Sequence, residues 1–291
     1  MNYRHHFHAG NFADVMKHVM LIALFRALQA KPKGFLFLDT HAGRGKYDLD
    51  TASAGQTSAR QPEWPQGIGR LWQLASETVP IGVAEYLRLV REFDRAEGNI
   101  TPQIRFYPGS PVIARLLARP VERLALCEKH PGETEALRRE MGRAERTSVH
   151  ELDGYIAVRS MLPPLEKRAF VLIDPPFESE DEFAQIAAAV GPVLPRAPAA
   201  TIAIWYPFTG RARVDEFFMA LRQLSLPPTL ACELAVAGVD APIKMRGCGL
   251  IVLNPPWQFD ATAKPMLTFL AETLAQGRGA GAQVSWIVPE K

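Results

Sequence analysis

The segment that ends at Asp174-Pro175-Pro176-Phe177 constrains this chain most strongly. Residues 169–173, Ala-Phe-Val-Leu-Ile, are all apolar and lead directly into it. A continuous apolar run of this length predicts a strand buried on both faces, as in a parallel sheet. Proline cannot donate a ladder hydrogen bond, so the two prolines should end the strand and present Asp174 at its carboxyl end. Ligands of open α/β sheets bind at that edge.

The same four residues suit recognition of an exocyclic amino group on a planar base. The Asp174 carboxylate and the Pro175 carbonyl can each accept one amino hydrogen, and the Phe177 ring can stack on the base. A strand end followed by a plain turn is the alternative role.

A glycine turn, residues 41–45, follows the first predicted strand at residues 35–39. Glycine lets backbone N–H groups approach a ligand that a Cβ would exclude. The spacing is neither the full dinucleotide fingerprint nor a P-loop, because Tyr47 follows Lys46. The turn is compatible with a nucleoside ligand such as S-adenosylmethionine.

Three later predicted strands each end in an acid, namely Glu128, Asp153 and Asp174. In a doubly wound fold, the acid after the second strand accepts from ribose hydroxyls, and the acid after the third faces an adenine amino group. Each acid taken singly could instead cap a helix. Glu128 follows Gly45 by far more than the roughly 20 residues typical of that fingerprint, which indicates an insertion.

These patterns predict an α/β protein with a Rossmann-like fold. Its sheet would be mostly parallel and doubly wound, with a terminal antiparallel strand and a helical insertion. Residues 1–49 would form an N-terminal arm, a helix over 12–29 and the first strand. Residues 50–102 would form the inserted helical subdomain, and residues 103–291 the rest of the main domain. Its last elements would be an antiparallel pair over 230–237 and 249–253.

The charge distribution suggests a polyanionic partner, although a solvated arm would look similar. The net charge is only +2, yet residues 1–46 contain seven Lys or Arg and two Asp or Glu. His5, His6 and His8 also lie there, but without regular spacing or a Cys or Glu partner, so we expect no metal site.

The cysteines and the hydropathy indicate a soluble, unexported, cytoplasmic protein. Cys127, Cys232 and Cys248 are far apart and lie in apolar runs, which predicts reduced core thiols rather than disulfides or zinc ligands. The most apolar early stretch, residues 19–28, is short and contains Arg26, so we expect no membrane segment.

A second candidate for the amino-group site is Asn254-Pro255-Pro256-Trp257. We favour Asp174 because this second motif follows the predicted terminal hairpin, away from the acid-bearing strand ends. Its expected role is to stop a strand and to pack Trp257.

Several motifs are spread over nearly the whole chain. They are Tyr3-Arg4-His5, Phe7-His8-Ala9-Gly10-Asn11, Asp14-Val15, Lys17-His18, Leu38-Asp39-Thr40-His41-Ala42-Gly43, Tyr107-Pro108-Gly109-Ser110-Pro111, the Asp174 motif and Asn254-Pro255-Pro256-Trp257. Together they resemble the RlmJ family, bacterial S-adenosylmethionine-dependent methyltransferases that modify adenine N6 in 23S ribosomal RNA. Phe177 stands where the family motif usually has Tyr, which keeps the stacking surface and removes a hydroxyl.

The resemblance implies a class I S-adenosylmethionine-dependent methyltransferase fold, roles for particular residues and a substrate. Tyr3, His5 and Lys17 would meet the RNA or the target adenosine. The substrate would be 23S ribosomal RNA, protein-free or in an early assembly intermediate, and we expect a monomeric enzyme. The cofactor site would be lined by His18, His41, Ser110, Glu128, Asp153, Gly154 and Asp174.

Other functions remain open at this point. An RNA-binding protein without catalysis would have no use for Asp174 and the cofactor acids. A nucleotide-dependent oxidoreductase would share the glycine turn and Glu128, but not the proline motif. DNA adenine methyltransferases also carry Asp-Pro-Pro-aromatic strand ends, and the N-terminal signature is what favours RNA. Candidate phosphate contacts are Arg211, Arg213, Lys244 and Arg246.

Overall fold

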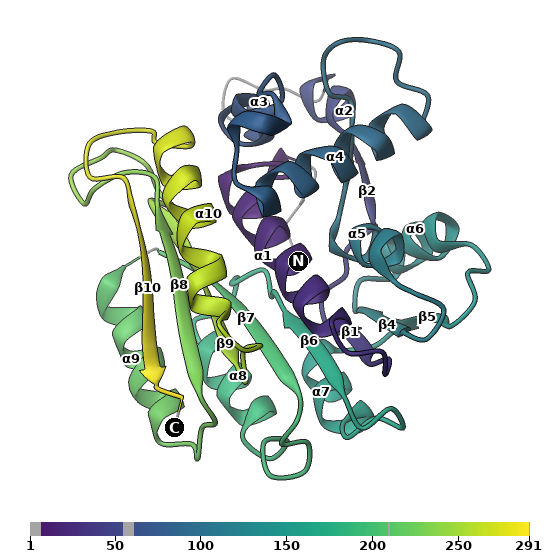
Figure 1. Cartoon of the computed structure of the whole chain (residues 1–291), viewed down its shortest axis with the longest axis vertical. Coiled ribbons are helices and arrows are strands. Elements are labelled where there is room, and N and C mark those ends of the chain that lie inside the picture. The colour runs from purple at the N-terminus through teal and green to yellow at the C-terminus, as the bar shows by residue number, and fades with distance from the viewer. Residues whose placement is uncertain (1–6, 55–60, 209, 291) are drawn as a thin grey trace.

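The computed structural model describes residues 7–54, 61–208 and 210–290. They form an eight-stranded sheet in the order β10-β8-β9-β7-β6-β1-β4-β5, with helices on both faces, and a separate ribbon of β2 and β3 (Figure 1). The strands are β1 (Leu36–Asp39), β2 (Lys46–Asp48), β3 (Phe106–Pro108), β4 (Arg123–Glu128), β5 (Thr147–Glu151), β6 (Ala169–Ile173), β7 (Thr201–Pro207), β8 (Thr229–Ala235), β9 (Gly247–Leu253) and β10 (Gly281–Val288). The α-helices are α1 (Phe12–Gln29), α2 (Leu49–Ala54), α3 (Ile68–Leu71), α4 (Ile81–Ala96), α5 (Ser110–Leu117), α6 (Pro131–Met141), α7 (Gly154–Met161), α8 (Glu182–Val190), α9 (Arg211–Arg222) and α10 (Phe259–Thr273).

Five strands, β7, β6, β1, β4 and β5, run parallel to one another, which confirms the expected mostly parallel doubly wound sheet. In the central strand, Leu36 pairs with Arg123 of β4 on one side and with Ala169 of β6 on the other. All five strands therefore begin at one edge of the sheet, here called the amino edge. They end at the other, here called the carboxyl edge.

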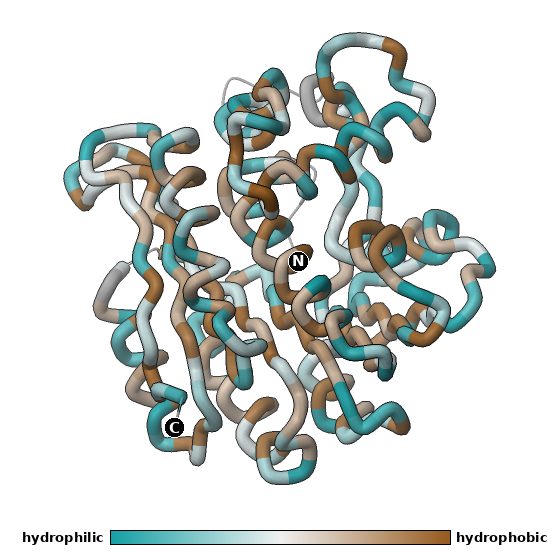
Figure 2. The backbone as a smooth tube through the Cα atoms, viewed as in Figure 1, coloured by the Kyte–Doolittle hydropathy of each residue, from teal (hydrophilic) through white to brown (hydrophobic). Residues whose placement is uncertain are grey.

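Two apolar cores lie on the two faces of this sheet, because successive side chains of a strand point to opposite faces. Phe37 and Leu172 pack on the face covered by α1, α4, α5, α6 and α10. Leu38 and Val171 pack on the face covered by α7, α8 and α9. Figure 2 shows the resulting pattern, with apolar positions along the central strands and hydrophilic ones concentrated in the loops.

The antiparallel part of the sheet is larger than expected. The predicted pair is confirmed as β8 and β9, and β9 also pairs antiparallel with β7. However, the prediction that β9 is the last strand is wrong, because β10 adds a further antiparallel strand on β8. This edge strand is exposed or half-buried along its length, so its sequence lacks the apolar run of a buried strand.

The chain between β1 and β4 contains the β2–β3 ribbon, the helices α2, α3 and α4, and two 3₁₀ turns, η2 (Trp64–Gln66) and η3 (Ser76–Thr78). The helical patterns predicted at 68–78 and 83–97 correspond to α3, η3 and α4. Ile68 and Val83 join the apolar cluster that also contains Val19 of α1. Helices in residues 50–102 thus share the main core, and a separate subdomain with those boundaries stays a prediction.

Helix α1 begins and ends where the sequence predicts. The Asn11 side chain accepts hydrogen bonds from the backbone N–H groups of Ala13 and Asp14, which caps the helix. Helices α4, α5 and α10 surround it, so its polar residues Lys17 and His18 are buried with the apolar ones. Among the described residues, no helix has both the length and the apolar character that crossing a membrane requires.

Candidate active site

The carboxyl edge gathers the four acids that follow the strands of the parallel sheet. Asp39 ends β1 and Glu128 ends β4. Asp153 and Asp174 follow β5 and β6. Because β6, β1, β4 and β5 are consecutive neighbours in the sheet, these acids form a row along one edge. The sequence-based expectation that the strand-end acids share an edge is met.

Lys17 of α1 joins this row through a contact with Asp174. Its ammonium nitrogen lies 2.5 Å from Oδ2 of Asp174 and 2.8 Å from Oδ1 of Asp14. The side chains of Lys17 and Asp174 are only 7% and 16% exposed. Burial by itself lowers the pKa of Lys17, but the two carboxylates outweigh burial and hold this pKa well above its ordinary value. Lys17 is therefore a buried counter-ion of Asp174.

This placement bears on the expected role of Lys17. The resemblance implied that Lys17 meets either the RNA or the target adenosine. An ammonium group enclosed by two carboxylates is poorly placed for an RNA phosphate, whereas it directly adjoins the side chain expected to hold the base. Contact of Lys17 with the RNA or with the target adenosine stays a prediction.

The Asp174 motif leaves the sheet in a constrained conformation. Pro175 is buried, and Phe177 has a φ of +50°, in the left-handed region that side-chain-bearing residues seldom adopt. The Phe177 ring contacts those of Phe183 and Trp205, with centroid separations of 5.2 and 5.7 Å. These aromatic neighbours fix a half-buried ring beside Asp174.

Asp39 is a fully buried acid at the centre of this edge. Its Oδ2 accepts a hydrogen bond of 2.7 Å from the Ser110 hydroxyl, and its Oδ1 has no hydrogen-bond partner among the described residues. Burial raises the pKa of Asp39 to about 7, the Ser110 hydrogen bond opposes this rise, and the charge of Asp174 adds to it. The sequence places Asp39 at a strand end, but Asp39 is not among the predicted site residues. Like Glu128, however, Asp39 is an acid that ends an apolar predicted strand.

His18 belongs to a buried chain of hydrogen bonds. Its Nδ1 is 2.8 Å from the Tyr107 hydroxyl, which is 3.0 Å from the Tyr86 hydroxyl. The chain links α1 to β3 and α4. His18 was expected to line the cofactor site, and it is buried, with 1% exposure. Its contact with the cofactor stays a prediction.

Glu128 orders the glycine turn after β1. Its Oε2 accepts a hydrogen bond of 2.9 Å from the Gly43 backbone, and its Oε1 accepts one of 2.8 Å from the His130 backbone. Gly43 has a φ of +60°, so a residue with a Cβ would be strained there. The carboxylate and the turn thus form one unit at the end of β4.

Asp153 and Gly154 form the start of α7. Oδ1 of Asp153 accepts from the backbone of Tyr155 at 3.0 Å, and its Oδ2 pairs with Lys129 at 3.0 Å. A Cβ on Gly154 would sit 2.3 Å from the Thr40 carbonyl oxygen, so glycine permits the close approach of α7 to the end of β1. A cavity of about 300 Å³ beside this helix is lined by Asp153, Tyr155, Ile156, Arg159, Gln185 and Ala188.

His41 adjoins the same helix start. Its Nδ1 is 2.8 Å from the Thr40 hydroxyl, and its ring meets that of Tyr155 edge-on. Burial lowers the pKa of His41 to about 4, so the ring is neutral at physiological pH. A neutral ring can donate or accept a hydrogen bond without adding charge to this edge.

Asn254 lies at the opposite edge of the sheet. Its carbonyl oxygen accepts from the Thr201 hydroxyl at the start of β7, because β9 runs antiparallel to β7. The second proline motif therefore lies where β7 begins, at the edge opposite to Asp174, and it ends β9 as expected. However, the expectation that Trp257 packs is wrong, since Trp257 is 78% exposed.

The remaining predicted residues divide into those that are described and those that are not. Tyr3 and His5 lie outside the described residues, as does His6. Within the described ranges, no three His, Cys, Asp or Glu side chains cluster as metal ligands would, and His8 pairs with Glu63. The absence of a metal site stays a prediction.

Three of the predicted phosphate contacts lie near the carboxyl edge, and the side chain of the fourth, Arg211, is outside the described part of the structure. Arg213 follows β7 on α9 and donates to the Glu180 carbonyl. Lys244 and Arg246 belong to the loop before β9, where Phe208 hydrogen-bonds to Gly247. Phosphate binding by these residues stays a prediction.

Comparison with known proteins gives consistent matches. Residues 32–288 match the family model described as "Ribosomal RNA large subunit methyltransferase D, RlmJ". Proteins named "Ribosomal RNA large subunit methyltransferase J" from Escherichia coli and Haemophilus influenzae are 37% and 35% identical, over the full length of both chains. A crystal structure of a Legionella pneumophila protein superposes with a TM-score of 0.82 at 32% identity, covering 96% of this chain and 97% of that one. The chain therefore belongs to the RlmJ family.

Proposed function

We propose that this protein transfers the methyl group of S-adenosylmethionine to N6 of one adenosine in 23S ribosomal RNA. The observation that carries the proposal is the environment of Asp174. One carboxylate oxygen is held by Lys17, and Oδ1 accepts no hydrogen bond from the described residues. Asp174 directly follows the end of β6, and Pro175 and Phe177 follow it in the chain.

This arrangement addresses the difficult part of the reaction. The N6 amino group of adenine is a poor nucleophile, because its lone pair is delocalised into the ring. S-adenosylmethionine supplies a methyl group that is already electrophilic, because a sulfonium carries it. Asp174 and the Pro175 carbonyl would accept the two amino hydrogens, which localises the lone pair on nitrogen and directs it toward the methyl donor.

The residues of the carboxyl edge fit the methyl donor as a ligand. Buried Asp39 offers an oxygen that no described residue satisfies, which suits a cationic or hydroxyl-bearing ligand. Glu128 and Asp153 bring carboxylates to the ends of neighbouring strands, where ribose hydroxyls and an amino group can donate to them. Gly43 keeps the turn open to close approach. His18, Ser110, His41 and Gly154 would position these groups.

The nucleic-acid side of the site requires that the target base leave its stack. Extrusion costs a few kcal/mol, least in unpaired RNA. Stacking on Phe177 would offset about 1–3 kcal/mol of this cost. Arg213, Lys244 and Arg246 would bind phosphates near the same edge. We further propose that the protein acts as a monomer in the cytoplasm, on protein-free RNA or an early assembly intermediate, with Tyr3 and His5 contacting the substrate.

The test is transfer of a labelled methyl group to protein-free 23S ribosomal RNA from a strain that lacks this gene. Wild type should form N6-methyladenine, whereas Asp174→Ala and the near-isosteric Asp174→Asn should not. Asn254→Ala is the matched control, because it alters the other proline motif at the opposite edge. Urea unfolding of each variant separates lost chemistry from lost folding.

The outcomes discriminate between the candidate functions. Loss of activity in Asn254→Ala but not in Asp174→Asn would show that the amino-group site is at Asn254 and that its assignment to Asp174 is wrong. Transfer to DNA but not to RNA would leave the reaction standing and refute the substrate. Binding of RNA without methyl transfer to any nucleic acid would refute the enzymatic proposal itself.

A further inference from the structure

The amino edge of the sheet carries a concentration of positive charge. Together, the segments that lead into the five parallel strands contain eight Lys or Arg and three Asp or Glu, whereas the whole chain has a net charge of only +2. These segments are residues 30–35, 118–122, 142–146, 162–168 and 191–200. Parallel register brings all five to one edge. With strands about 4.8 Å apart, the row extends roughly 20 Å.

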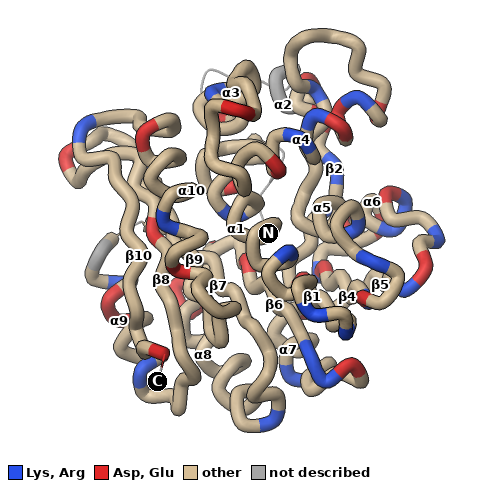
Figure 3. Tube along the Cα trace, viewed as in Figure 1, with Lys and Arg blue, Asp and Glu red and all other residues tan. Residues whose placement is uncertain are grey.

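We call this row the amino-edge strip. Figure 3 shows blue positions gathered around the strand labelled β1, near the middle of the strip. Its cations are Lys31, Lys33, Arg119, Arg143, Arg146, Lys167, Arg168 and Arg196.

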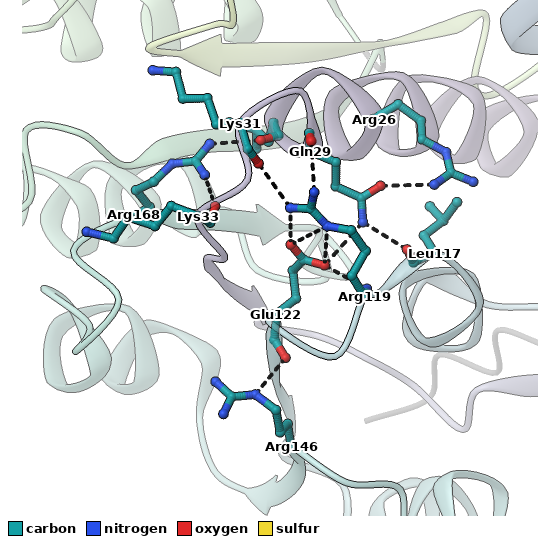
Figure 4. A network of polar contacts seen from close by, with 10 residues as sticks. Arg26, Gln29, Lys31, Lys33, Leu117, Arg119, Glu122, Arg146 and Arg168 are labelled. Atoms are coloured by element: carbon teal, nitrogen blue, oxygen red, sulfur yellow. Dashed lines mark hydrogen bonds and ion pairs between the residues drawn. The ribbon is translucent and has the colours of Figure 1, made fainter.

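Arg119 joins two of these segments. It forms a short two-pronged ion pair with the buried carboxylate of Glu122 and donates to the carbonyl oxygens of Gln29 at 3.0 Å and Lys31 at 3.1 Å. Figure 4 shows the guanidinium lying between these groups. The last carbonyls of a helix lack partners within the helix, so Arg119 stabilises the end of α1 and fixes the chain that follows.

Arg168 acts in the same way but without a carboxylate. It donates to the Leu28 carbonyl at 2.8 Å and to the Lys33 carbonyl. The ammonium groups of Lys31, Lys33 and Lys167, in contrast, make no ion pair or hydrogen bond with any described residue, and all three side chains are exposed. Figure 4 shows those of Lys31 and Lys33 extending away from the network. Arg119 and Arg168 therefore have a structural role, whereas the ammonium groups of the three lysines have none within this network.

We propose that the amino-edge strip binds phosphates of a segment of the substrate RNA that is remote from the target adenosine. The strands between the two edges are four to seven residues long, so the strip lies roughly 15–20 Å from Asp174. A short substrate bound at the carboxyl edge would not reach the strip, whereas a large folded RNA can contact both. Exposed cations without counter-ions, held on an ordered backbone, match a phosphate backbone. This inference rests on the proposed function, because it assumes an RNA substrate.

A simpler alternative is that the lysines only offset the negative end of α1. In that case, their removal would lower stability slightly and leave RNA binding unchanged. The two explanations make different predictions for RNA affinity.

The experiment compares two variants with the same change in net charge. The first is Lys31→Ala, Lys33→Ala and Lys167→Ala. The matched control is Arg88→Ala, Arg139→Ala and Arg278→Ala, which removes three exposed cations from α4, α6 and the segment before β10. Affinity for 23S ribosomal RNA is measured against salt concentration. Methyl transfer is measured with that RNA and with a short fragment centred on the modified adenosine.

Each lost phosphate contact should reduce the slope of log affinity against log salt by about one. The slope of log affinity against log salt should therefore be smaller by about two to three for the lysine variant than for the wild type. Between about 50 and 200 mM salt, wild-type affinity should fall roughly 15- to 65-fold more than that of the lysine variant. For methyl transfer, KM should rise with the full-length RNA and stay unchanged with the fragment, while kcat is unchanged with both.

Two results would overturn the inference. Equal salt slopes for the lysine variant and the control would show that the strip binds no phosphate. An equal rise of KM for the fragment and the full RNA would show that the effect does not come from a remote segment. Failure of the wild type to methylate any RNA is a separate result, because it refutes the proposed function.

Discussion

Replacing Lys17 by Met should destabilise the protein strongly, because it leaves two carboxylates in a buried site without their counter-ion. Asp14 and Asp174 have side chains that are only 4% and 16% exposed, and both contact the Lys17 ammonium. Removing one partner of a buried ion pair typically costs about 3–5 kcal/mol. Since Asp174 keeps some contact with water, we expect a loss of about 3 kcal/mol. A methionine of similar length fills the space, so the loss should report charge rather than a cavity.

A second variant isolates the electrostatic cause. Lys17→Met combined with Asp14→Asn removes one of the two uncompensated charges and retains an oxygen that can accept from the Gly10 backbone. The double variant should therefore recover about 1–2 kcal/mol of the loss. The folded-state pKa of Lys17 is raised, so its stabilising effect is fully present below the unfolded value of 10.5 and is lost only as pH rises through the folded value. The titration of Lys17 itself therefore adds no pH dependence to the loss at neutral pH.

Urea unfolding followed by tryptophan fluorescence measures both variants. With a slope of about 3 kcal/mol per molar urea, a loss of about 3 kcal/mol shifts the midpoint by roughly 1 M. A shift of less than a few tenths molar for Lys17→Met would refute the argument, because the ammonium would then not compensate buried charge. So would a double variant that is less stable than the single one.

Three further changes test other parts of the site. Asp39→Asn should stabilise the protein increasingly as pH rises from about 4 to about 7, and by a constant amount above pH 7. The reason is that the raised pKa of Asp39 makes the wild type lose stability over that window. Urea midpoints measured across pH check this prediction, and a difference between variant and wild type that does not change with pH contradicts it. Gly154→Ala should cost about 1–3 kcal/mol and weaken binding of S-adenosylmethionine in calorimetry, because the new Cβ meets the Thr40 carbonyl. Gly132→Ala, whose Cβ has ordinary contacts, is the control and should be tolerated. Phe177→Ala should raise KM for RNA roughly 5- to 150-fold through lost stacking, whereas Phe177→Tyr should behave like wild type in the same steady-state assay.

The elements that the sequence predicts well are those with strong local signals. Helix α1 has a capping Asn11 and an apolar run, and β6 has five apolar residues followed by prolines. Strand β10 was missed because an edge strand need not be apolar: it contains Gly281, Gln283 and Ser285 and is paired on one side only. Its pairing with β8 depends on tertiary context, which a single sequence does not display.

The candidate site also has parts that the sequence predicts and parts that it does not. The strand-end acids could be placed on one edge, because parallel strands end together. The contact between Lys17 and Asp174 could not be foreseen, since it joins residues 157 positions apart and depends on how α1 packs across the sheet. The burial of Asp39 also depends on packing, with Ser110 supplied by another element.

The structure also shows which of the strand-end acids cap a helix. Asp153 caps α7 through one oxygen, and its other oxygen pairs with the exposed Lys129, so capping does not exclude a ligand role. Glu128 binds the glycine turn through one oxygen and the backbone N–H of His130, directly before α6, through the other. Asp174 differs from both, because no helix begins until Glu182 and its oxygens accept no backbone N–H from the described residues. Neither capping nor turn formation accounts for an acid at this position, which leaves the ion pair with Lys17 and the proposed contact with a substrate amino group.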